Sequence, residues 1–202
     1  MGRPSNFDRE AAIEKAMNRI WAEGYEACSV KSLSEMLGIT RSSFYNAFGS
    51  REELFLEVFD LYLTQLPELH LEKCNEADGA KHVITRLMVS LVEIRFGNDI
   101  RPGCLLVNCA VELIGKTETL GQVLNGALCG LAEKLQTVLS DGIEQGELSP
   151  DLDVPAVAHG VLAFLLGVNV MSKMSVSRQD ALAAGYAFLD RYGLRAEEKT
   201  IQ

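Results

Sequence analysis

Apolar residues recur along most of the chain at spacings of three and four, the period of an amphipathic α-helix. The first such stripe lies between Asp8, a suitable N-cap, and Gly24, a suitable terminator. Strand alternation and hairpin turn signals are absent. The sequence therefore predicts an all-α protein. The predicted helices are the stretch between Asp8 and Gly24, residues 30–37, 41–48, the stretch that begins after Ser50, and residues 82–96, 103–114, 120–143, 154–174 and 178–192.

The second and third predicted helices are short and are joined by Gly38, Ile39 and Thr40. The second of the pair buries Phe44 and Phe48 one turn apart and exposes polar residues on its other faces. Such a pair suits a helix-turn-helix motif, whose second helix enters the major groove of DNA. On geometry alone an ordinary helical hairpin explains it equally well.

The sequence of this segment adds a resemblance. Residues 24–54 contain Gly38-Ile39-Thr40-Arg41-Ser42-Ser43-Phe44-Tyr45 and Ser50-Arg51-Glu52-Glu53-Leu54. This run resembles the DNA-binding domain of the TetR family of bacterial transcriptional repressors. The resemblance implies a helix-turn-helix domain over residues 1–52, followed by a larger helical ligand-binding and dimerisation domain over residues 53–202.

The resemblance also implies which side chains meet DNA. Tyr45 would give its hydroxyl to a phosphate, and Arg51 would touch the backbone. Arg41 suits either a guanine edge or a phosphate. Ala47 departs from the family, which often has His or Tyr there, so one backbone contact should be lost. The candidate DNA-binding residues are Arg3 in an N-terminal arm that can reach the minor groove, Lys31, Thr40, Arg41, Ser42, Ser43, Tyr45, Asn46 and Arg51.

The last two predicted helices suggest that the protein is a dimer. Small residues recur at spacings of three or four in 154–174 and 178–192, and the family usually dimerises through its last two helices. A homodimer would present two recognition helices to a palindromic operator. The expected partners are double-stranded operator DNA and a second copy of the chain. The resemblance adds an inducer, which is either a small molecule or an electrophile or oxidant. No cofactor or metal site is expected.

One cysteine is a candidate sensor. Cys104 is expected in the first turn of a helix, where the helix dipole favours a reactive thiolate. The Gly103-Cys104-Leu105 stretch resembles a TetR subgroup that responds to electrophiles or oxidants through a cysteine. The alternative is a buried, inert thiol. The candidate ligand or redox residues are Cys104, Asn108, Cys109, Phe164 and Lys173, the last as a cationic neighbour.

Composition and charge limit the kinds of protein that the chain can be. The chain has 202 residues and a net charge of −9, which disfavours binding to nucleic acid. Residues 31–51, however, hold Lys31, Arg41 and Arg51 against one acidic residue, so this segment is locally positive. Its longest uninterrupted apolar run is too short to span a bilayer, so a soluble, cytoplasmic protein without a membrane partner is expected. Five cysteines lack metal-ligand spacing.

Three readings of function follow. None of the three histidines has a recognisable catalytic spacing, so an enzyme is not expected. The leading hypothesis is a repressor released by a small molecule or by modification of Cys104. One alternative is a TetR-fold regulator that has a non-covalent apolar ligand and no thiol switch. The other is an interaction protein that no longer binds DNA, which the acidic balance and Ala47 permit.

Overall fold

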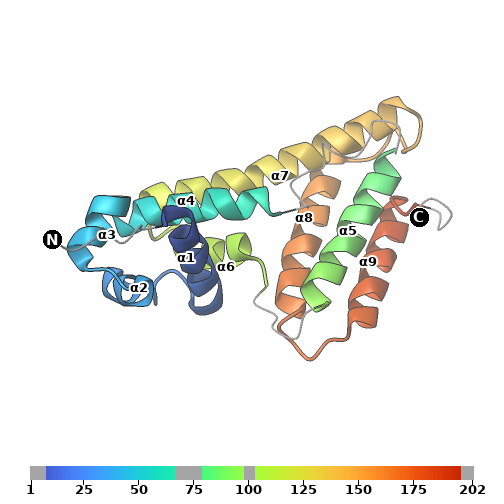
Figure 1. Ribbon diagram of the computed structural model, residues 1–202. Coiled ribbons are helices and arrows are strands. Elements are labelled where there is room, and N and C mark those ends of the chain that lie inside the picture. Colours follow the sequence, from blue (N-terminus) through green and yellow to red (C-terminus); the bar gives the residue numbers. More distant parts are fainter. Residues whose placement is uncertain (1–7, 67–78, 98–102, 197–202) are drawn as a thin grey trace. The chain divides into compact units, whose positions relative to one another are not determined.

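The computed structural model describes residues 8–66, 79–97 and 103–196. All regular structure in these ranges is helical, which confirms the predicted class (Figure 1). The helices are α1 (Arg9–Glu23), α2 (Val30–Leu37), α3 (Arg41–Phe48), α4 (Arg51–Thr64), α5 (Ala80–Phe96), α6 (Leu105–Leu113), α7 (Glu118–Glu144), α8 (Val154–Met171) and α9 (Arg178–Tyr192).

Contacts between helices divide the chain into two compact units. The described part of unit 1 is residues 8–66 and 104–124, and that of unit 2 is residues 79–97, 103 and 125–196. Unit 1 contains α1 to α4, α6 and the start of α7. Helix α7 continues into unit 2, which also holds α5, α8 and α9.

The core of unit 1 is aromatic. Phe44, Phe55 and Phe59 are fully buried, and the rings of Phe55 and Tyr25 meet edge to face with centroids 4.9 Å apart. Helices α1 and α4 pack along each other, and α3 packs between α2 and α4. Burying an aromatic side chain removes a large apolar area from water, so these rings hold the short helices α2 and α3 in place.

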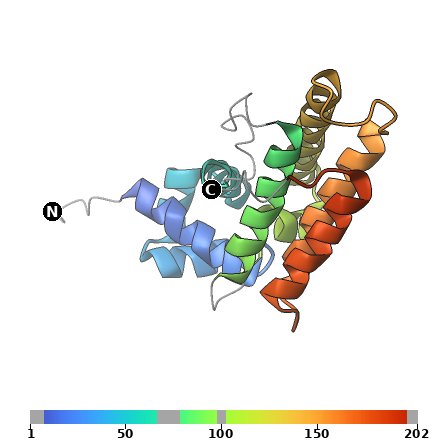
Figure 2. The same cartoon turned by 90° about the vertical axis from the view of Figure 1, so that its right-hand side faces the viewer.

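Unit 2 is a bundle in which α5, α8 and α9 pack against one another (Figure 2). Its core is aliphatic, with Ile84, Leu135, Val161 and Leu189 fully buried. Helix α8 is also long and apolar enough to cross a membrane by length and composition alone, with a mean hydropathy of 1.9. That test is passed equally by core helices of soluble proteins, and the buried side of α8 lies in this core.

The ends of several helices differ from the predicted ones. Helix α6 begins at Leu105, so Cys104 is the N-cap and not a residue of the first turn. Helix α8 ends at Met171 rather than at residue 174. The segment after α9 is anchored where it begins, because Leu194 is fully buried and Thr85 Oγ1 accepts the N–H of Ala196 at 3.0 Å.

Candidate nucleic-acid interface

Helix α3 is set by local hydrogen bonds and by two buried rings. Thr40 is its N-cap and accepts the backbone N–H of Ser43 at 3.1 Å. Phe44 and Phe48 are buried one turn apart. Because these rings fix one side of the helix in the core, the remaining sides face solvent, as the sequence predicted.

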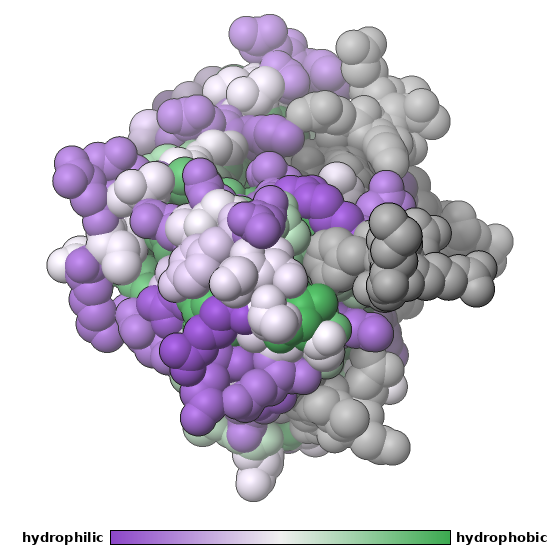
Figure 3. Space-filling model, turned by 60° about the vertical axis from the view of Figure 1, so that its left-hand side comes forward, coloured by the Kyte–Doolittle hydropathy of each residue, from purple (hydrophilic) through white to green (hydrophobic). Residues whose placement is uncertain are grey.

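The solvent side of α3 carries the residues expected to meet DNA. All of its candidates are exposed, and the Tyr45 side chain is 52% exposed. Lys31 on α2 is also exposed and forms only a long ion pair with Glu35, at 4.0 Å. Figure 3 brings the left-hand side of Figure 1, where α2 and α3 lie, toward the viewer, and the described surface seen there is mainly hydrophilic. The exposed candidates on and before α3 are Thr40, Arg41, Ser42, Ser43, Tyr45 and Asn46.

Arg51 differs from the other candidates because it is held by protein groups. Its guanidinium lies over the ring of Tyr25, 4.1 Å from the ring centroid, and 3.7 Å from a carboxylate oxygen of Glu26. Burial raises the pKa of the Tyr25 hydroxyl, and the nearby Arg51 partly opposes this shift. Arg51 sits in the first turn of α4, after the N-cap Ser50. Arg3, the remaining candidate, lies outside the described residues.

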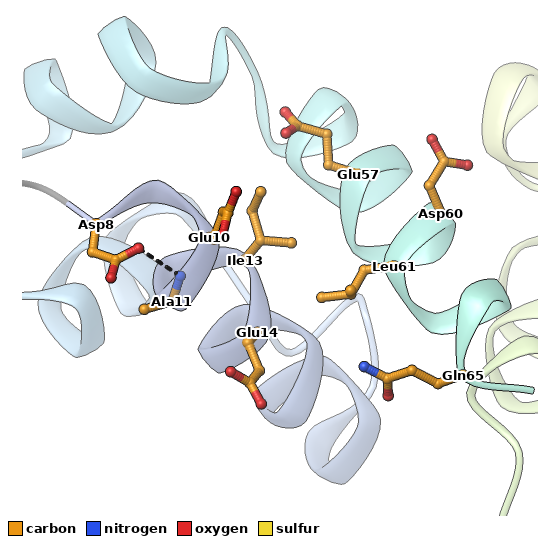
Figure 4. A pocket seen from close by; sticks show the side chains of 9 residues that line it. All are labelled: Asp8, Glu10, Ala11, Ile13, Glu14, Glu57, Asp60, Leu61 and Gln65. Atoms are coloured by element: carbon orange, nitrogen blue, oxygen red, sulfur yellow. Dashed lines mark hydrogen bonds between the residues drawn. The ribbon is translucent and has the colours of Figure 1, made fainter.

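A hollow between α1 and α4 is lined by acidic side chains, in contrast to the DNA-binding candidates, none of which is acidic. Figure 4 shows the side chains that line it, and its volume is about 760 Å³. One of its acids, Glu57, pairs with Arg9, and Asp8 caps α1 through the N–H of Ala11. This acidic surface suits phosphate poorly. Within the described ranges no cluster of three or more His, Cys, Asp or Glu residues could hold a metal ion. The acids that line the hollow are Asp8, Glu10, Glu14, Glu57 and Asp60.

Cys104 is buried at the N-terminal end of α6, with 7% of the residue exposed. The Tyr62 hydroxyl donates to Cys104 Sγ at 3.4 Å and accepts the N–H of Leu105 at 3.1 Å. The tyrosine therefore caps α6 in place of the cysteine side chain, which makes no cap hydrogen bond itself. No pattern in the sequence links residues 62 and 104, so this pairing was not predicted.

The other cysteines and candidate ligand residues differ in their burial and contacts. Burial, followed by the charge of Glu112, raises the pKa of Cys109 to about 12, so its thiol stays protonated at neutral pH. Asn108 is half-buried on α6. Phe164 stacks on Phe188 with ring centroids 5.7 Å apart. Of the described cysteines, Cys28 is buried and Cys129 is exposed, and none of the described cysteines forms a disulfide.

Lys173 is exposed just beyond the end of α8 and packs against Gly103 within unit 2. A Cβ atom on Gly103 would lie 2.8 Å from Lys173 Cε, and the φ of Gly103 is +78°. Only glycine fits this backbone position comfortably. Gly103 is bonded directly to Cys104, so the lysine lies against the residue that precedes the cysteine.

A polar recognition helix on a two-helix motif, joined to a separate helical bundle, defines the class of helix-turn-helix transcriptional regulators. Family models agree. Residues 12–58 match "Bacterial regulatory proteins, tetR family" and residues 83–187 match "Tetracyclin repressor-like, C-terminal domain". The chain belongs to the TetR family.

Individual relatives point the same way. The chain is 27% identical over 178 residues to the HTH-type transcriptional repressor ComR of Escherichia coli, covering 87% of this chain and 84% of ComR. It is 40% identical over 62 residues to the repressor BdcR of the same species, covering 31% and 32%. A cysteine mutant of the TetR-family regulator CifR, solved with 26-bp double-strand operator DNA, is 29% identical, with a TM-score of 0.83 and coverage of 95% and 100%.

Proposed function

We propose that the protein is a repressor that binds a palindromic operator as a homodimer and is released by modification of Cys104 or by a small molecule. In this proposal residues 1–52 form the DNA-binding domain, and residues 53–202 bind the ligand and dimerise. The observation that carries it is the exposed polar side of α3, fixed by Phe44 and Phe48. The likeness to CifR, solved on operator DNA, supports the same use of this helix.

A second copy of the chain fits the exposed apolar side of α8 and α9. Val170, near the end of α8, and Met174, just beyond it, are 56% and 55% exposed, and Tyr192 is 41% exposed on α9. Ala163 on α8 and Ala184 on α9 are also exposed, and their small side chains leave room for close helix packing. Exposed apolar area of this kind is typical of a protein interface. Two copies would carry two α3 helices, as a two-fold operator requires.

Release through Cys104 follows from its hydrogen bonds. An electrophile with an activated double bond would form a carbon–sulfur bond with Sγ, while the thiol proton passes to the neighbouring carbon of the electrophile. The adduct adds volume beside a sulfur that is almost completely buried. It would displace the Tyr62 hydroxyl, which caps α6 at Leu105. Lys173, which packs against Gly103, together with Asn108 and Phe164, completes the candidate ligand residues of this proposal.

The test is a mobility-shift titration on the DNA upstream of the gene that encodes the protein. Wild type, Cys104→Ser and the matched control Cys129→Ser are each compared before and after treatment with N-ethylmaleimide. All three should bind the DNA untreated, because α3 is unchanged. Treatment with N-ethylmaleimide should release wild type and Cys129→Ser from the DNA, whereas Cys104→Ser should stay bound. Release of all three would place the sensor elsewhere, and absence of any shift would contradict DNA binding itself.

A regulator of this kind acts where bacterial DNA is, so the proposal places it in the cytoplasm, without an enzymatic activity. A salt titration of the same shift adds an independent check. Phosphate contacts make the affinity fall steeply as salt rises. Binding that does not depend on salt would argue against contacts from Arg41, Tyr45 and Arg51.

A further inference from the structure

The connection between α1 and α2 is held by a carboxylate from far along the chain. Glu112 on α6 accepts the backbone N–H of Tyr25 at 3.1 Å and that of Glu26 at 2.7 Å. Gly24 precedes them with a φ of +87°, and a Cβ atom there would lie 3.1 Å from Glu112 Oε2. The glycine therefore lets the backbone approach the carboxylate closely. Hydrogen bonds to a charged acceptor are stronger than those between neutral groups.

The two residues that Glu112 holds are the same two that hold Arg51. The Tyr25 ring lies under the Arg51 guanidinium, and the Glu26 carboxylate lies 3.7 Å from it. The Arg51 side chain is 28% exposed, so these contacts restrict it while one side stays open. An arginine that is already ordered loses less conformational entropy when it meets a phosphate. The position of residues 25 and 26 therefore bears on the affinity of Arg51 for DNA.

Helix α6 is placed to move Glu112. It is nine residues long, and its first residue follows Cys104, which is bonded directly to Gly103 of unit 2. Its N-terminal end rests on the Tyr62 hydroxyl, and its C-terminal end carries Glu112. A helix transmits displacement along its axis because its backbone is internally hydrogen-bonded. A shift at Leu105 would therefore be felt at Glu112, about 10 Å away along the axis.

We propose that Glu112 is a positioning residue for DNA binding: it grips the Tyr25 and Glu26 amides, and through them it aligns Arg51 for a phosphate. A change in α6 then alters operator affinity without touching α3. The inference rests on the proposed function, because the phosphate contact of Arg51 belongs to it. The grip itself is a property of unit 1 alone.

The first measurement is amide hydrogen exchange at residue resolution on the free protein. In wild type the Glu26 amide should exchange slowly although the residue is exposed, because Glu112 holds it. Glu112→Gln removes the charge and one of the two acceptor oxygens, so both amides should exchange about tenfold faster. Glu118→Gln, the same change at an exposed residue of α7, should leave them unchanged. Glu112→Asp, which keeps the charge on a shorter side chain, serves if the Gln variant does not fold.

The second measurement is a double-mutant cycle on operator DNA. Glu112→Gln should weaken binding about fivefold relative to Glu118→Gln, which removes the same charge. In an Arg51→Ala background the two glutamine variants should bind within about twofold of each other, because Arg51 no longer reports the position of the turn. Rescue of binding by Glu112→Asp would support the role of the charge.

Two results would overturn the inference. Unchanged exchange at residues 25 and 26 in Glu112→Gln would show that the carboxylate does not hold the turn. An equal loss of DNA binding with and without Arg51 would show that Glu112 only supports the fold. If wild type binds no operator, the proposed function and the DNA-positioning role both fail, whereas the exchange result still reports separately on the grip.

Discussion

Helices α3 and α6 are both short, but their N-terminal ends are held in different ways. Helix α3 is capped by Thr40, the residue that immediately precedes it. Helix α6 has Cys104 at the same position without a side-chain cap, and the hydroxyl of Tyr62, 43 residues earlier, takes that place. A locally capped helix keeps its start when other elements shift. The start of α6 depends on a second helix, so α6 suits transmission of change and α3 suits recognition.

The core face of α3 gives the largest expected effect. Phe44→Ala should lower the free energy of unfolding by about 3–5 kcal/mol, because it removes a fully buried ring and leaves a cavity. Chemical denaturation measures the loss, and operator binding should disappear with it. Tyr45→Phe is the matched control on the exposed face and should leave stability unchanged. A stable Phe44→Ala variant would show that α3 is not anchored through this ring.

The long-range cap of α6 comes next. Tyr62→Phe removes the hydroxyl that serves both Leu105 and Cys104 and leaves a buried N–H without its acceptor. The expected loss is about 1–3 kcal/mol in the free energy of unfolding. Tyr192→Phe, at an exposed ring, should cost much less. If both variants are equally stable, the Tyr62 hydroxyl does not hold α6, and the contrast between the two caps fails.

The local cap of α3 should have a smaller effect. Thr40→Ala should cost about 1 kcal/mol, the usual value for an N-cap, because the Ser43 N–H loses its acceptor. Ser42→Ala, at an exposed residue two positions after Thr40, is the control. Exchange of the first amides of α3 should quicken in Thr40→Ala while those of α6 stay as they are. Faster exchange in α6 as well would mean that the two helices are not independently capped.

The smallest effect concerns pH. The folded pKa of Cys109 is raised to about 12, mainly by burial, whereas an unfolded thiol ionises near its ordinary value. Its contribution to stability is therefore complete below about pH 8.5 and is lost as pH rises toward 12. Between pH 8 and pH 9 wild type should lose about 0.7 kcal/mol more than Cys109→Ala in denaturation. An identical pH dependence of the two proteins would contradict the burial of this thiol.

The sequence was most informative where structure is decided locally. Thr40 and Ser50 each stand one residue before a helix, and Phe44 and Phe48 define the buried side of α3 by their spacing alone. These features follow from rules that operate over four residues. The cap at the start of α6 and the hold of Glu112 on the α1–α2 connection could not be predicted in this way. Tyr62 and Glu112 act across 43 and 87 residues, and no periodicity in a single sequence connects them.

The same distinction explains the differences at Cys104 and at the C-terminal end. The apolar pattern predicted a helix from residue 103 with Cys104 in its first turn, but the first helical residue is Leu105, so the cysteine lies outside that turn. The residues after 194 are mainly polar, which is typical of a loose tail. Burial of Leu194 depends on α5, more than 100 residues earlier, which composition cannot show.

That anchoring of the C-terminal end bears on the order of events during synthesis. Thr85 on α5 and the carbonyl of Leu194 are 109 residues apart, and ribosomes add roughly 5–20 residues per second. Helix α5 therefore waits about 5–20 s for the segment that completes its core. Helix α8 also packs against α5 and is made earlier, so only the last part of this core waits until translation is ending.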